Sequence, residues 1–463
     1  MFFILSCGKG LVKAVILAGG LGTRLRPLTY TVPKPMLPVA NKPILDHIIE
    51  RLAGAGIDGA IVTTNYLAKQ IDEHVKKANY KIPVEVVEET VPLGTAGAVR
   101  NVRWKLDSDF LVTQGDIISS IDLREHLAAH RGVATISLTK VENPSAYGIA
   151  ELEEDGRVKR FLEKPGTGEC FSNLANTGTY SFSHEILDFI PDGRCDFSLD
   201  VFPSLLEQKK PVYGVAQEGY WKDVGSIANY LSGNRYMLGG LASGQTGEKA
   251  FVSRNAKLIP PFIIGDGAQV GADVLIGPNT VIGNNCQVGS GSEITGAILH
   301  DSVKLGSGCK VESCIIGDKS ELGEGVFVAS RAIIGSGCII ERKASVASGS
   351  VVGPIVKVQA STQVSGVLSP NIEKIERVSS ILDKIPVFKK LERDELQVCM
   401  TLVEFGELGS EALSKVSKVP KEQLDRSLTK LEKMGIISSG EGNFSMRYED
   451  PETIYDWIKR RVL

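Results

Sequence analysis

Short apolar runs alternate with helix-like segments over the first half of the chain. Four runs have the length of buried strands: Ala14–Leu17, Gly59–Thr64, Val84–Val87 and Phe110–Asp116. Between them, Pro43–Ala55 and Leu67–Ala78 place apolar residues at helical spacing. This alternation predicts an α/β domain over residues 12–235 with a doubly wound, mostly parallel, Rossmann-like sheet. Its ligand site is expected at the carboxyl ends of the strands.

A second pattern begins later, where aliphatic residues recur every six positions. The series runs through Ile264, Val270, Ile276, Ile282, Val288 and Ile294, and after two five-residue steps through Ile316, Leu322, Val328, Ile334, Ile340 and Val346. Glycine follows most of them. This hexapeptide repeat predicts a left-handed parallel β-helix over residues 258–357, after a linker at 236–257. A β-sandwich would not keep a strict six-residue count.

Residues 371–463 follow Pro370 and show three amphipathic segments and then two strand-like ones. The expected helices are Leu391–Val403, Ser410–Val416 and Lys421–Met434, and the expected strands are Gly435–Ile437 and Phe444–Arg447. This order resembles a winged helix, a small α+β domain. The segment carries 16 Lys and Arg against 17 Asp and Glu, whereas a DNA-binding module is distinctly basic. We therefore expect regulation or subunit contact rather than nucleic-acid binding.

Composition narrows the class of protein further. The 463 residues are 43% apolar with a net charge of −3, which gives no general attraction to nucleic acid or anionic lipid. No apolar run approaches the ~20 residues of a membrane span. Eight cysteines without C-x-x-C pairs form neither a zinc pattern nor a disulfide framework, so a cytoplasmic location is expected. Met1–Leu11 is a poor signal peptide, and we interpret it as an upstream start with Val12 as the true initiator.

The stretch after the first predicted strand carries the strongest chemical signal. Residues 17–29 are LAGGLGTRLRPLT, with three glycines within four residues, and PKP follows at 33–35. Backbone N–H groups of such a loop form an anion-binding concavity, and Arg24 can fork onto phosphate oxygens. Lys34 is held between two prolines, so a stiff backbone presents its amine. Neither G-x-G-x-x-G nor G-x-x-x-x-G-K-[ST] is present, and the stretch predicts a triphosphate cradle of another kind.

This stretch resembles the signature of the sugar-1-phosphate nucleotidyltransferases, L-A-G-G-x-G-[TS]-R-L-x-P-L-T followed by P-K-P. The resemblance covers residues 12–357 and is greatest to the mannose-1-phosphate guanylyltransferases with a hexapeptide tail. It implies transfer of a nucleotidyl group from an NTP to a sugar-1-phosphate, with release of pyrophosphate. Arg24 and Lys34 are then catalytic. The nucleotide-binding residues of the loop are Leu17, Gly19, Gly20, Gly22 and Thr23.

Two aspartates match the metal-binding positions of this family. Asp116 ends a predicted strand, and a carboxylate at the carboxyl end of a strand that faces a polyphosphate suits Mg²⁺. Asp223 lies in YWKDVG at 220–225, which resembles W-x-D-[IV]-G. Each alone is as well explained as a helix cap or turn residue. Together they are assigned as catalytic and metal-binding, with Mg²⁺ as the cofactor.

Residues 88–97, EETVPLGTAG, stand at the place of the family's base-binding loop. The resemblance assigns nucleotide contacts to Pro92, Gly94 and Thr95, and it places a base-reading side chain near Glu89. A carboxylate only accepts hydrogen bonds, which suits the N1–H and 2-amino donors of guanine better than uracil or thymine. GTP is therefore the favoured nucleotide.

Sugar recognition is expected between the two aspartates. Gly148 allows close approach of the backbone to a sugar hydroxyl. The motif E-K-P supplies Glu163 for sugar hydroxyls and Lys164 for the sugar phosphate, unless this lysine is only a solvated one beside a turn. The motif N-x-G-x-Y supplies Asn176 and Gly178. Catalysis would then rest on positioning and charge stabilisation, without a covalent intermediate.

The best interpretation is a mannose-1-phosphate guanylyltransferase that makes GDP-mannose. Gln114 departs from the N-[GS]-D of that group. A uridylyl- or thymidylyltransferase acting on glucose- or N-acetylglucosamine-1-phosphate therefore stays open. So does a non-catalytic regulatory subunit that binds nucleotide sugar, although the presence of Arg24, Lys34 and both aspartates speaks against it.

The β-helix is expected to form a homo-oligomer or support the active site. Solenoids of this type also carry acyltransferase sites, so acetyl transfer is the alternative. His300 is the sole histidine after residue 184 and therefore the one candidate for a general base there.

Overall fold

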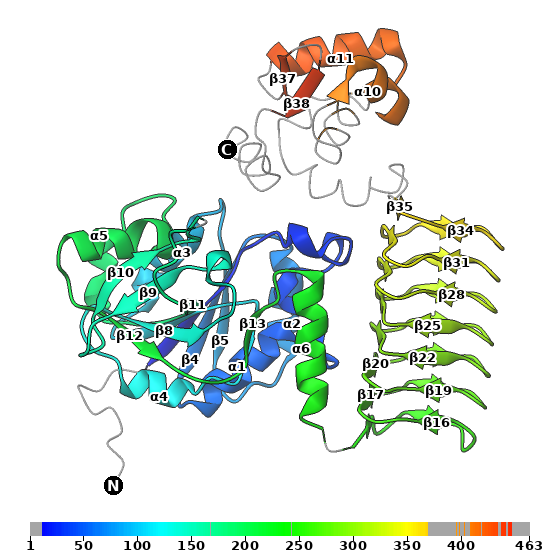
Figure 1. Ribbon diagram of the computed structural model, residues 1–463, viewed down its shortest axis with the longest axis horizontal. Coiled ribbons are helices and arrows are strands. Elements are labelled where there is room, and N and C mark those ends of the chain that lie inside the picture. The colour runs from blue at the N-terminus through cyan, green and yellow to red at the C-terminus, as the bar shows by residue number, and fades with distance from the viewer. Residues whose placement is uncertain are drawn as a thin grey trace. The chain divides into compact units, whose positions relative to one another are not determined.

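The computed structural model describes two compact units of the chain, Met1–Leu368 and Ser369–Leu463, which we treat separately (Figure 1). The described residues are 12–166, 168–241, 243–368, 395, 398, 402, 408–417, 419–433, 437–440 and 443–446. The first unit holds an α/β domain and a β-helix. No helix in the described part of the chain is long and apolar enough to cross a membrane.

Four parallel strands form one half of a nine-stranded sheet. They are β1 (Lys13–Ala18), β4 (Gly59–Thr64), β5 (Val84–Glu88) and β6 (Phe110–Gln114), in the order β6-β1-β4-β5. Ile16 of β1 pairs with Val62 of β4 and with Thr113 of β6. The four predicted strands are therefore confirmed, and β1 lies in the middle of the parallel half.

The other half of the sheet is largely antiparallel. Its strands are β8 (Ala134–Lys140), β9 (Ile149–Leu152), β10 (Val158–Leu162), β11 (Leu174–Phe182) and β12 (Val212–Ala216). Strand β11 runs antiparallel to β6, β8 and β9, whereas β12 pairs parallel with β8. The connection of residues 153–157 between β9 and β10 is too short for a parallel crossover, which needs a dozen residues or more. The α/β fold is confirmed, but the sheet is mixed.

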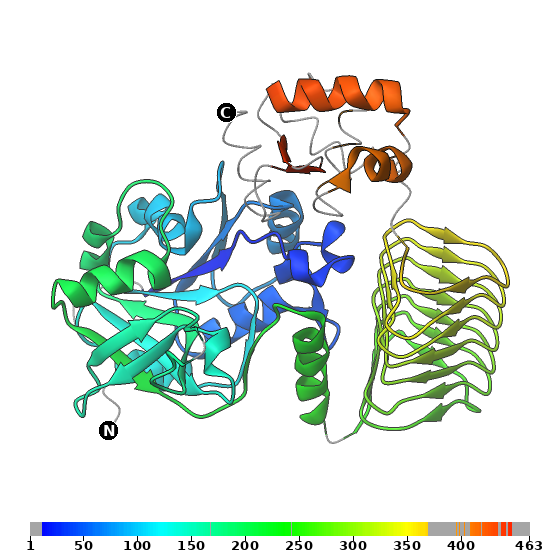
Figure 2. The ribbon, with the colours of Figure 1, turned by 45° about the horizontal axis from the view of Figure 1, so that its top comes forward.

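Helices cover both faces of this sheet. Alternate residues of β1 show this, since they pack into two different cores. Ile16 lies in a core with residues of α1 (Ile44–Gly54), and Val15 lies in another with residues of α3 (Gly94–Asn101). Figure 2 shows the layers. The other helices are α2 (Ala68–Lys77), α4 (Leu123–Ala128), α5 (Phe202–Glu207) and α6 (Ile227–Gly239). The 3₁₀ helices are η1 (Thr23–Leu25), η2 (Leu28–Tyr30), η3 (Lys34–Met36), η4 (Arg103–Lys105), η5 (Pro144–Ala146) and η6 (His184–Phe189), and η7 (Phe197–Val201) is a π-helix.

Four short strands complete the α/β domain in two antiparallel pairs. They are β2 (Pro38–Val39) with β3 (Lys42–Pro43), and β7 (Ile117–Ser119) with β13 (Trp221–Asp223).

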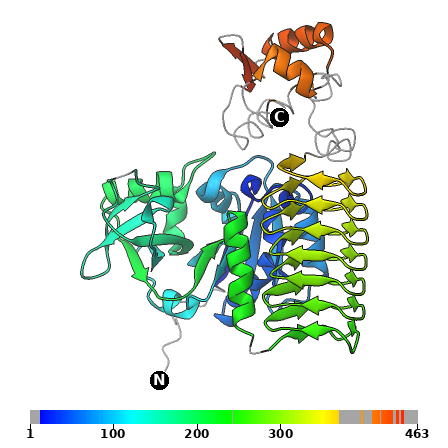
Figure 3. The ribbon, with the colours of Figure 1, turned by 45° about the vertical axis from the view of Figure 1, so that its right-hand side comes forward.

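The β-helix consists of three parallel sheets that stack its successive turns (Figure 3). The first sheet is β14 (Gln245–Thr246), β17 (Phe262–Ile264), β20 (Thr280–Ile282), β23 (Ile298–Leu299), β26 (Ile315–Ile316), β29 (Ile333–Ile334), β32 (Val351–Val352) and β35 (Val367–Leu368). The second is β15 (Phe251–Val252), β18 (Gln269–Val270), β21 (Gln287–Val288), β24 (Lys304–Leu305), β27 (Glu321–Leu322), β30 (Ile339–Ile340) and β33 (Lys357–Val358). The third is β16 (Lys257–Leu258), β19 (Leu275–Ile276), β22 (Glu293–Thr295), β25 (Lys310–Glu312), β28 (Phe327–Val328), β31 (Ser345–Val346) and β34 (Gln363–Val364).

The predicted left-handed parallel β-helix is confirmed, with wider bounds. Its strands run from Gln245 to Leu368, so most of the predicted linker 236–257 belongs to α6 or to the first turn. These outer turns keep the six-residue spacing, as at Val252 and Val364, but no glycine follows there. The inward aliphatic residues form one continuous core.

One face of the β-helix packs against the α/β domain. The outward residues of its first sheet are aliphatic and buried, as at Val281, Ile298 and Ile315, and they share a core with α1 and α6. The solenoid is therefore joined to the α/β domain by an apolar seam.

The second unit contains two described helices and a three-stranded antiparallel sheet. The elements are α10 (Ser410–Ser417), α11 (Lys421–Lys433), β36 (Leu408–Gly409), β37 (Ile437–Gly440) and β38 (Asn443–Met446), with the sheet order β36-β38-β37. Helix α11 buries Leu424, Leu428 and Leu431, the face predicted from sequence.

The remaining predictions for this unit are tested only in part. Within the predicted helix 391–403, only Glu395, Val398 and Leu402 are described, and they are helical. Gly435, Ile436 and Arg447 lie outside the described residues. The winged helix therefore stays a prediction.

Candidate active site

The glycine-rich loop after β1 turns back on itself. Gly22 has a φ of +64°, and a Cβ there would lie 3.0 Å from the Thr29 side chain. The Thr29 hydroxyl donates to the Gly22 carbonyl at 2.7 Å and closes the turn. Gly20 is exposed, and a Cβ there would meet no atom within 4 Å. The loop therefore leaves open space beside its backbone, as an approaching phosphate requires.

Two cations follow this loop. Arg24 lies in η1, beside Thr23, with an exposed side chain. Lys34 begins η3, and only 13% of its side chain is exposed. Its ammonium group forms an ion pair with the Asp116 carboxylate. Two residues that the sequence places 82 positions apart therefore meet beside the loop.

A short antiparallel ladder brings Asp116 and Asp223 together. Asp116 directly precedes β7, and Asp223 ends β13, the strand that pairs with β7. The Val224 N–H donates to the Asp116 carbonyl at 2.7 Å. Burial, and after it the charge of Asp116, raises the pKa of Asp223. The charges of Lys34 and Arg24 lower the same pKa. A Cβ at Gly225 would meet both the Asp223 carboxylate and the Arg24 guanidinium group, and Lys34 is paired with Asp116, so the four groups lie together.

Close packing holds the backbone next to Asp116. A Cβ at Gly115 would lie 2.8 Å from the Leu17 carbonyl, which accepts the Gly115 N–H at 2.8 Å. Gly178 has a φ of +74°, and a Cβ there would lie 2.6 Å from the Gln114 side chain. In addition to their predicted binding roles, Leu17 and Gly178 therefore have a structural role. Both pack against the end of β6, next to Asp116.

The paired carboxylates fit a divalent cation. Two carboxylates that lie close together repel each other, and each raises the pKa of the other. A divalent cation between them balances both negative charges. Mg²⁺ takes only one or two protein carboxylates, because phosphate oxygens and water complete its coordination. The described residues contain no cluster of three or more His, Cys, Asp and Glu side chains that would hold a metal by themselves.

Glu89 is buried next to the glycine-rich loop, with 4% of its surface exposed. Its Oε2 accepts the Leu93 N–H at 3.2 Å, and the Asn65 amide donates to its carbonyl at 2.7 Å. A Cβ at Gly19 would lie 3.5 Å from its Oε1. The carboxylate therefore faces the loop that would hold the nucleotide, and it also shapes the turn after β5.

The loop that follows is anchored to residues 193–197. Thr95 donates to the Asp196 carboxylate from its N–H at 2.9 Å and from its hydroxyl at 3.1 Å. Gly94 has a φ of +74°, and a Cβ there would lie 2.6 Å from the Cys195 carbonyl. Pro92 lies half-buried before them. The Thr95 N–H and hydroxyl are thus both used to hold the loop against Asp196.

Three of the predicted sugar-binding residues meet in space. A Cβ at Gly148 would lie 2.5 Å from Glu163 Oε2 and 3.6 Å from the Asn176 Cβ. The Asn176 N–H donates to the Gly148 carbonyl at 2.8 Å. Burial raises the pKa of Glu163, whereas Lys164 and a hydrogen bond from Ser198 lower it. Lys164 itself is exposed at the edge, with a φ of +44°.

The structure adds residues that were not assigned from sequence. The Tyr147 ring packs edge-on against Trp221 with centroids 5.0 Å apart, and burial together with the Asp223 charge raises the pKa of Tyr147. This links the sugar segment to the aspartate pair. The Asn229 amide donates to the carbonyl of Asp223 at 2.9 Å and to its Oδ1 at 3.1 Å. Its signal was the S-x-x-N at 226–229, where the Ser226 hydroxyl caps α6.

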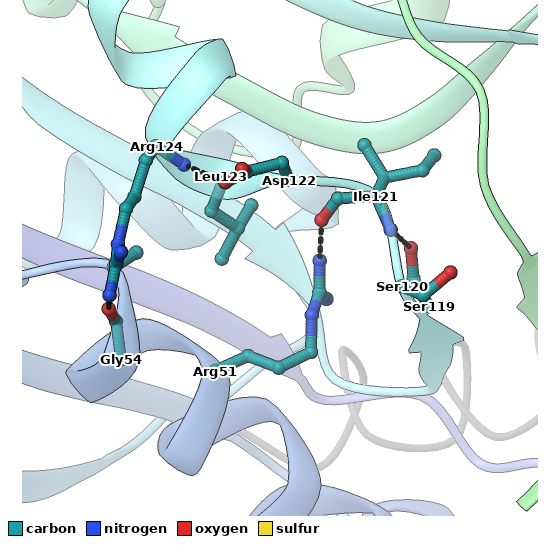
Figure 4. A pocket seen from close by; sticks show the side chains of 9 residues that line it. Arg51, Gly54, Ser119, Ser120, Ile121, Asp122, Leu123 and Arg124 are labelled. Carbon is teal, nitrogen blue, oxygen red and sulfur yellow. Dashed lines mark hydrogen bonds between the residues drawn. The ribbon is translucent and has the colours of Figure 1, made fainter. Parts of the chain in front are cut away.

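A separate cavity of about 370 Å³ lies between the end of α1 and the connection from β7 to α4 (Figure 4). Arg51 donates to the Ile121 carbonyl at 2.8 Å, and Arg124 Nε donates to the Gly54 carbonyl at 3.0 Å. None of the predicted site residues lines this cavity. The candidate active site is therefore the open loop region and not this cavity.

Transfer of a nucleotidyl group requires a loop that binds phosphates and a carboxylate pair that binds a divalent cation beside it. Comparison with known proteins indicates the same class of enzyme, the nucleotidyltransferases. Residues 13–239 match the family described as nucleotidyl transferase. Residues 245–346 match the EIF2B subunit epsilon LbH domain. Neither match extends into the second unit.

Relatives of known name cover most of the first unit's length. A mannose-1-phosphate guanylyltransferase from Mycobacterium tuberculosis is 36% identical over 310 residues, which are 63% of this chain and 81% of that protein. The mannose-1-phosphate guanylyltransferase catalytic subunit beta of Drosophila pseudoobscura is 37% identical over 275 residues, which are 57% and 73%. The crystal structure of HddC from Yersinia pseudotuberculosis complexed with GMP-PN superposes with a TM-score of 0.44 at 30% identity, over 49% of this chain and 99% of that one.

The chain belongs to the nucleotidyl transferase family and is a nucleotidyltransferase. Within that family, the relatives that establish its membership are mannose-1-phosphate guanylyltransferases. Membership implies a nucleoside triphosphate and a sugar phosphate as substrates, and a divalent metal ion as cofactor.

Proposed function

We propose that the chain transfers a guanylyl group from GTP to mannose-1-phosphate and releases GDP-mannose and pyrophosphate. The observation that carries the chemistry is the convergence of Lys34, Asp116 and Asp223 beside the glycine-rich loop. The choice of substrates is supported by the names of the relatives that match over the same residues.

The transfer is an in-line displacement at phosphorus. A phosphate oxygen of mannose-1-phosphate forms a bond to the α-phosphorus of GTP, and the bond from that phosphorus to the bridging oxygen breaks. The electron pair leaves with pyrophosphate. Backbone N–H groups at residues 19–23 orient the triphosphate, and Arg24 and Lys34 balance the charge that develops on its oxygens.

The metal site serves the same step. Asp116 and Asp223 would hold Mg²⁺, and Asn229 keeps Asp223 oriented through two hydrogen bonds. Bound Mg²⁺ supplies Lewis-acid polarisation of the phosphate oxygens. Asp116 also forms an ion pair with Lys34, so the proposed metal ligand and the phosphate-facing cation lie side by side.

Recognition of guanine is assigned to Glu89. Its carboxylate faces Gly19 from a buried position, where hydrogen bonds to N1–H and the 2-amino group would be strong. Uracil and thymine do not offer this pair of donors on one edge. The residues Gly148, Glu163 and Asn176 form the sugar site, and Lys164 at its exposed edge receives the sugar phosphate.

The structure gives less support to the other interpretations. His300 is 2% exposed and shares a hydrogen bond with the Tyr230 hydroxyl, so it is not placed to act as a base on a substrate of the β-helix. Assembly through the β-helix stays a prediction, and one of its three faces is already covered by the α/β domain.

The experiment is pyrophosphate release in Mg²⁺, with GTP, UTP and dTTP each crossed with mannose-, glucose- and N-acetylglucosamine-1-phosphate. A maximum at GTP with mannose-1-phosphate is expected. A maximum at UTP or dTTP would keep the reaction class and refute the substrates. If nucleotide binds and no combination releases pyrophosphate, the chain is a regulatory relative.

A further inference from the structure

We propose that Tyr230 of α6 and His300 of the β-helix are positioning residues for Lys34. The proposal rests on the proposed function, in which Lys34 acts on the nucleotide phosphates. Residues 31–41, here called the Lys34 segment, lie where the α/β domain meets the β-helix. Figures 1 and 3 show α6 between the sheet and the solenoid.

The Lys34 segment contacts the β-helix at both of its ends. The Thr31 hydroxyl donates to the Ser336 hydroxyl oxygen at 3.1 Å. The Asn41 amide donates to the Ile282 carbonyl at 2.6 Å. These bonds join parts of the chain that are 305 and 241 positions apart. The solenoid therefore binds the segment at its start and end and leaves Lys34 between the two anchors.

A third connection passes through two buried side chains. The Tyr230 hydroxyl donates to the Pro38 carbonyl at 2.5 Å and lies 2.8 Å from His300 Nε2. A hydroxyl has one hydrogen, so His300 Nε2 must carry a proton and donate to the Tyr230 oxygen. His300 Nδ1 then faces Asp318 Oδ2 at 3.9 Å. The hydrogen bonds thus run from the β-helix through α6 to the backbone of the Lys34 segment.

The link from Pro38 to Lys34 is short and stiff. The Leu37 N–H donates to the Lys34 carbonyl at 3.1 Å, which closes the 3₁₀ turn. Leu37 and Val39 flank Pro38 with no exposed surface, in the same core as outward residues of the β-helix. A shift of Pro38 is therefore passed to Lys34 rather than absorbed by a flexible loop. Displacement of a catalytic group by about 1 Å costs up to about 100-fold in rate.

Tyr230→Phe tests the proposal, since it removes the hydroxyl and keeps the ring. We expect kcat/KM for pyrophosphate release to fall about tenfold, mostly in kcat, in the full chain. In a Lys34→Met background, measured with enzyme in excess, the same substitution should change the rate less than about twofold. An equal loss in both backgrounds, or no loss in the wild type, would overturn the proposal.

Variants of His300 and a control variant in the β-helix separate a positioning role from a general effect on stability. His300→Gln keeps an N–H donor near the Nε2 position and should restore most of the activity that His300→Ala loses. Ser320→Ala is the matched control, because its buried hydroxyl also makes two hydrogen bonds, to the Gly335 carbonyl at 2.9 Å and from the Cys338 N–H at 3.2 Å, away from the seam. It should leave kcat/KM unchanged. If Ser320→Ala lowers kcat/KM as much as Tyr230→Phe does, the loss reflects general destabilisation of the protein and the positioning role is refuted.

One further variant and one further measurement keep the test independent of folding and of the reaction. Asn41 has a φ of +62°, so Asn41→Gly removes its amide without straining the backbone, and a loss of about threefold is expected. If the wild type releases no pyrophosphate, the proposed function fails, and hydrogen exchange of the full chain decides the structural claim. Amides 34–41 should then exchange faster in Tyr230→Phe and His300→Ala but not in Ser320→Ala. Unchanged exchange would refute the positioning role.

Discussion

The carboxylates of the candidate site in the α/β domain and the thiols in the core of the β-helix differ in what surrounds them. In the α/β domain, Asp223 and Glu163 are partly buried beside other charges, and burial raises their pKa values. In the β-helix, buried thiols donate to carbonyl oxygens, and burial raises the pKa of Cys338 to about 11. Perturbed carboxylates that face one another mark chemistry, whereas protonated, paired thiols mark packing. The comparison assigns catalysis to one region and support to the other.

Substitution of the aspartate pair is the strongest test of the assignment of catalysis to the α/β domain. Asp116→Asn and Asp223→Asn should each lower kcat on the order of 1,000-fold, because each removes one negative ligand of the metal. Pyrophosphate release in Mg²⁺ measures the loss, and an unchanged thermal midpoint shows that the fold is kept. Activity within tenfold of the wild type in both variants would contradict the assignment of the site.

A substitution in the β-helix should have the opposite profile. Ile334 has no exposed surface and lies in the solenoid core, so Ile334→Ala should cost about 2–5 kcal/mol of unfolding free energy. Its effect on kcat/KM at 25 °C should be small. Ile339, 45% exposed on the next strand of the chain, is the matched control, and Ile339→Ala should cost less than about 0.5 kcal/mol. Denaturant unfolding measures both, and equal costs would refute the packing account.

The α/β domain should also be the acid-sensitive region. Burial, with the neighbouring His130, lowers the pKa of His126 to about 4. The unfolded chain takes up a proton at this histidine near pH 6.5 and the folded chain does not, so stability falls as pH falls between these values. The loss reaches about 3 kcal/mol. His126→Leu should flatten the dependence between pH 7 and pH 4, and a parallel curve would show that other groups cause the acid sensitivity.

The smallest effect is expected in base selection. Glu89→Gln keeps the size of the side chain but replaces one acceptor oxygen by a donor. We expect the preference for GTP over UTP to fall about tenfold, since one hydrogen bond to the base is lost and one N–H group opposes another. The ratio of kcat/KM for the two nucleotides measures it. An unchanged ratio would leave Glu89 with only its role in the turn at Leu93.

Much of the fold was predictable because its signals are local. The strand Gly59–Thr64 was predicted with the bounds that the structure shows, and the six-residue repeat identified the solenoid. The antiparallel half of the sheet was not predicted, because most of its pairings, such as β11 with β6 and with β8, join strands that do not follow one another along the chain. The covered face of the β-helix did carry a signal that was not used. An aliphatic residue precedes the inward one in every third hexapeptide, as at Ile263, Val281 and Ile298.

The site was predictable as a set of motifs but not as a geometry. Asp116 and Asp223 meet only because the three-residue strands β7 and β13 pair, and strands that short have no periodic signal. Tyr230 and His300 are joined across the seam for the same reason, since contacts between distant segments depend on packing. At Thr95 the motif indicated a nucleotide contact, whereas the Thr95 hydroxyl donates a hydrogen bond to Asp196.

The most direct test of the central claim is a crystal structure of the full chain with Mg²⁺ and a non-hydrolysable GTP analogue. The account predicts the triphosphate along residues 19–24, the metal between Asp116 and Asp223, and the guanine edge at Glu89. A nucleotide bound in the cavity beside Arg51 and Arg124, with the glycine-rich loop empty, would contradict it.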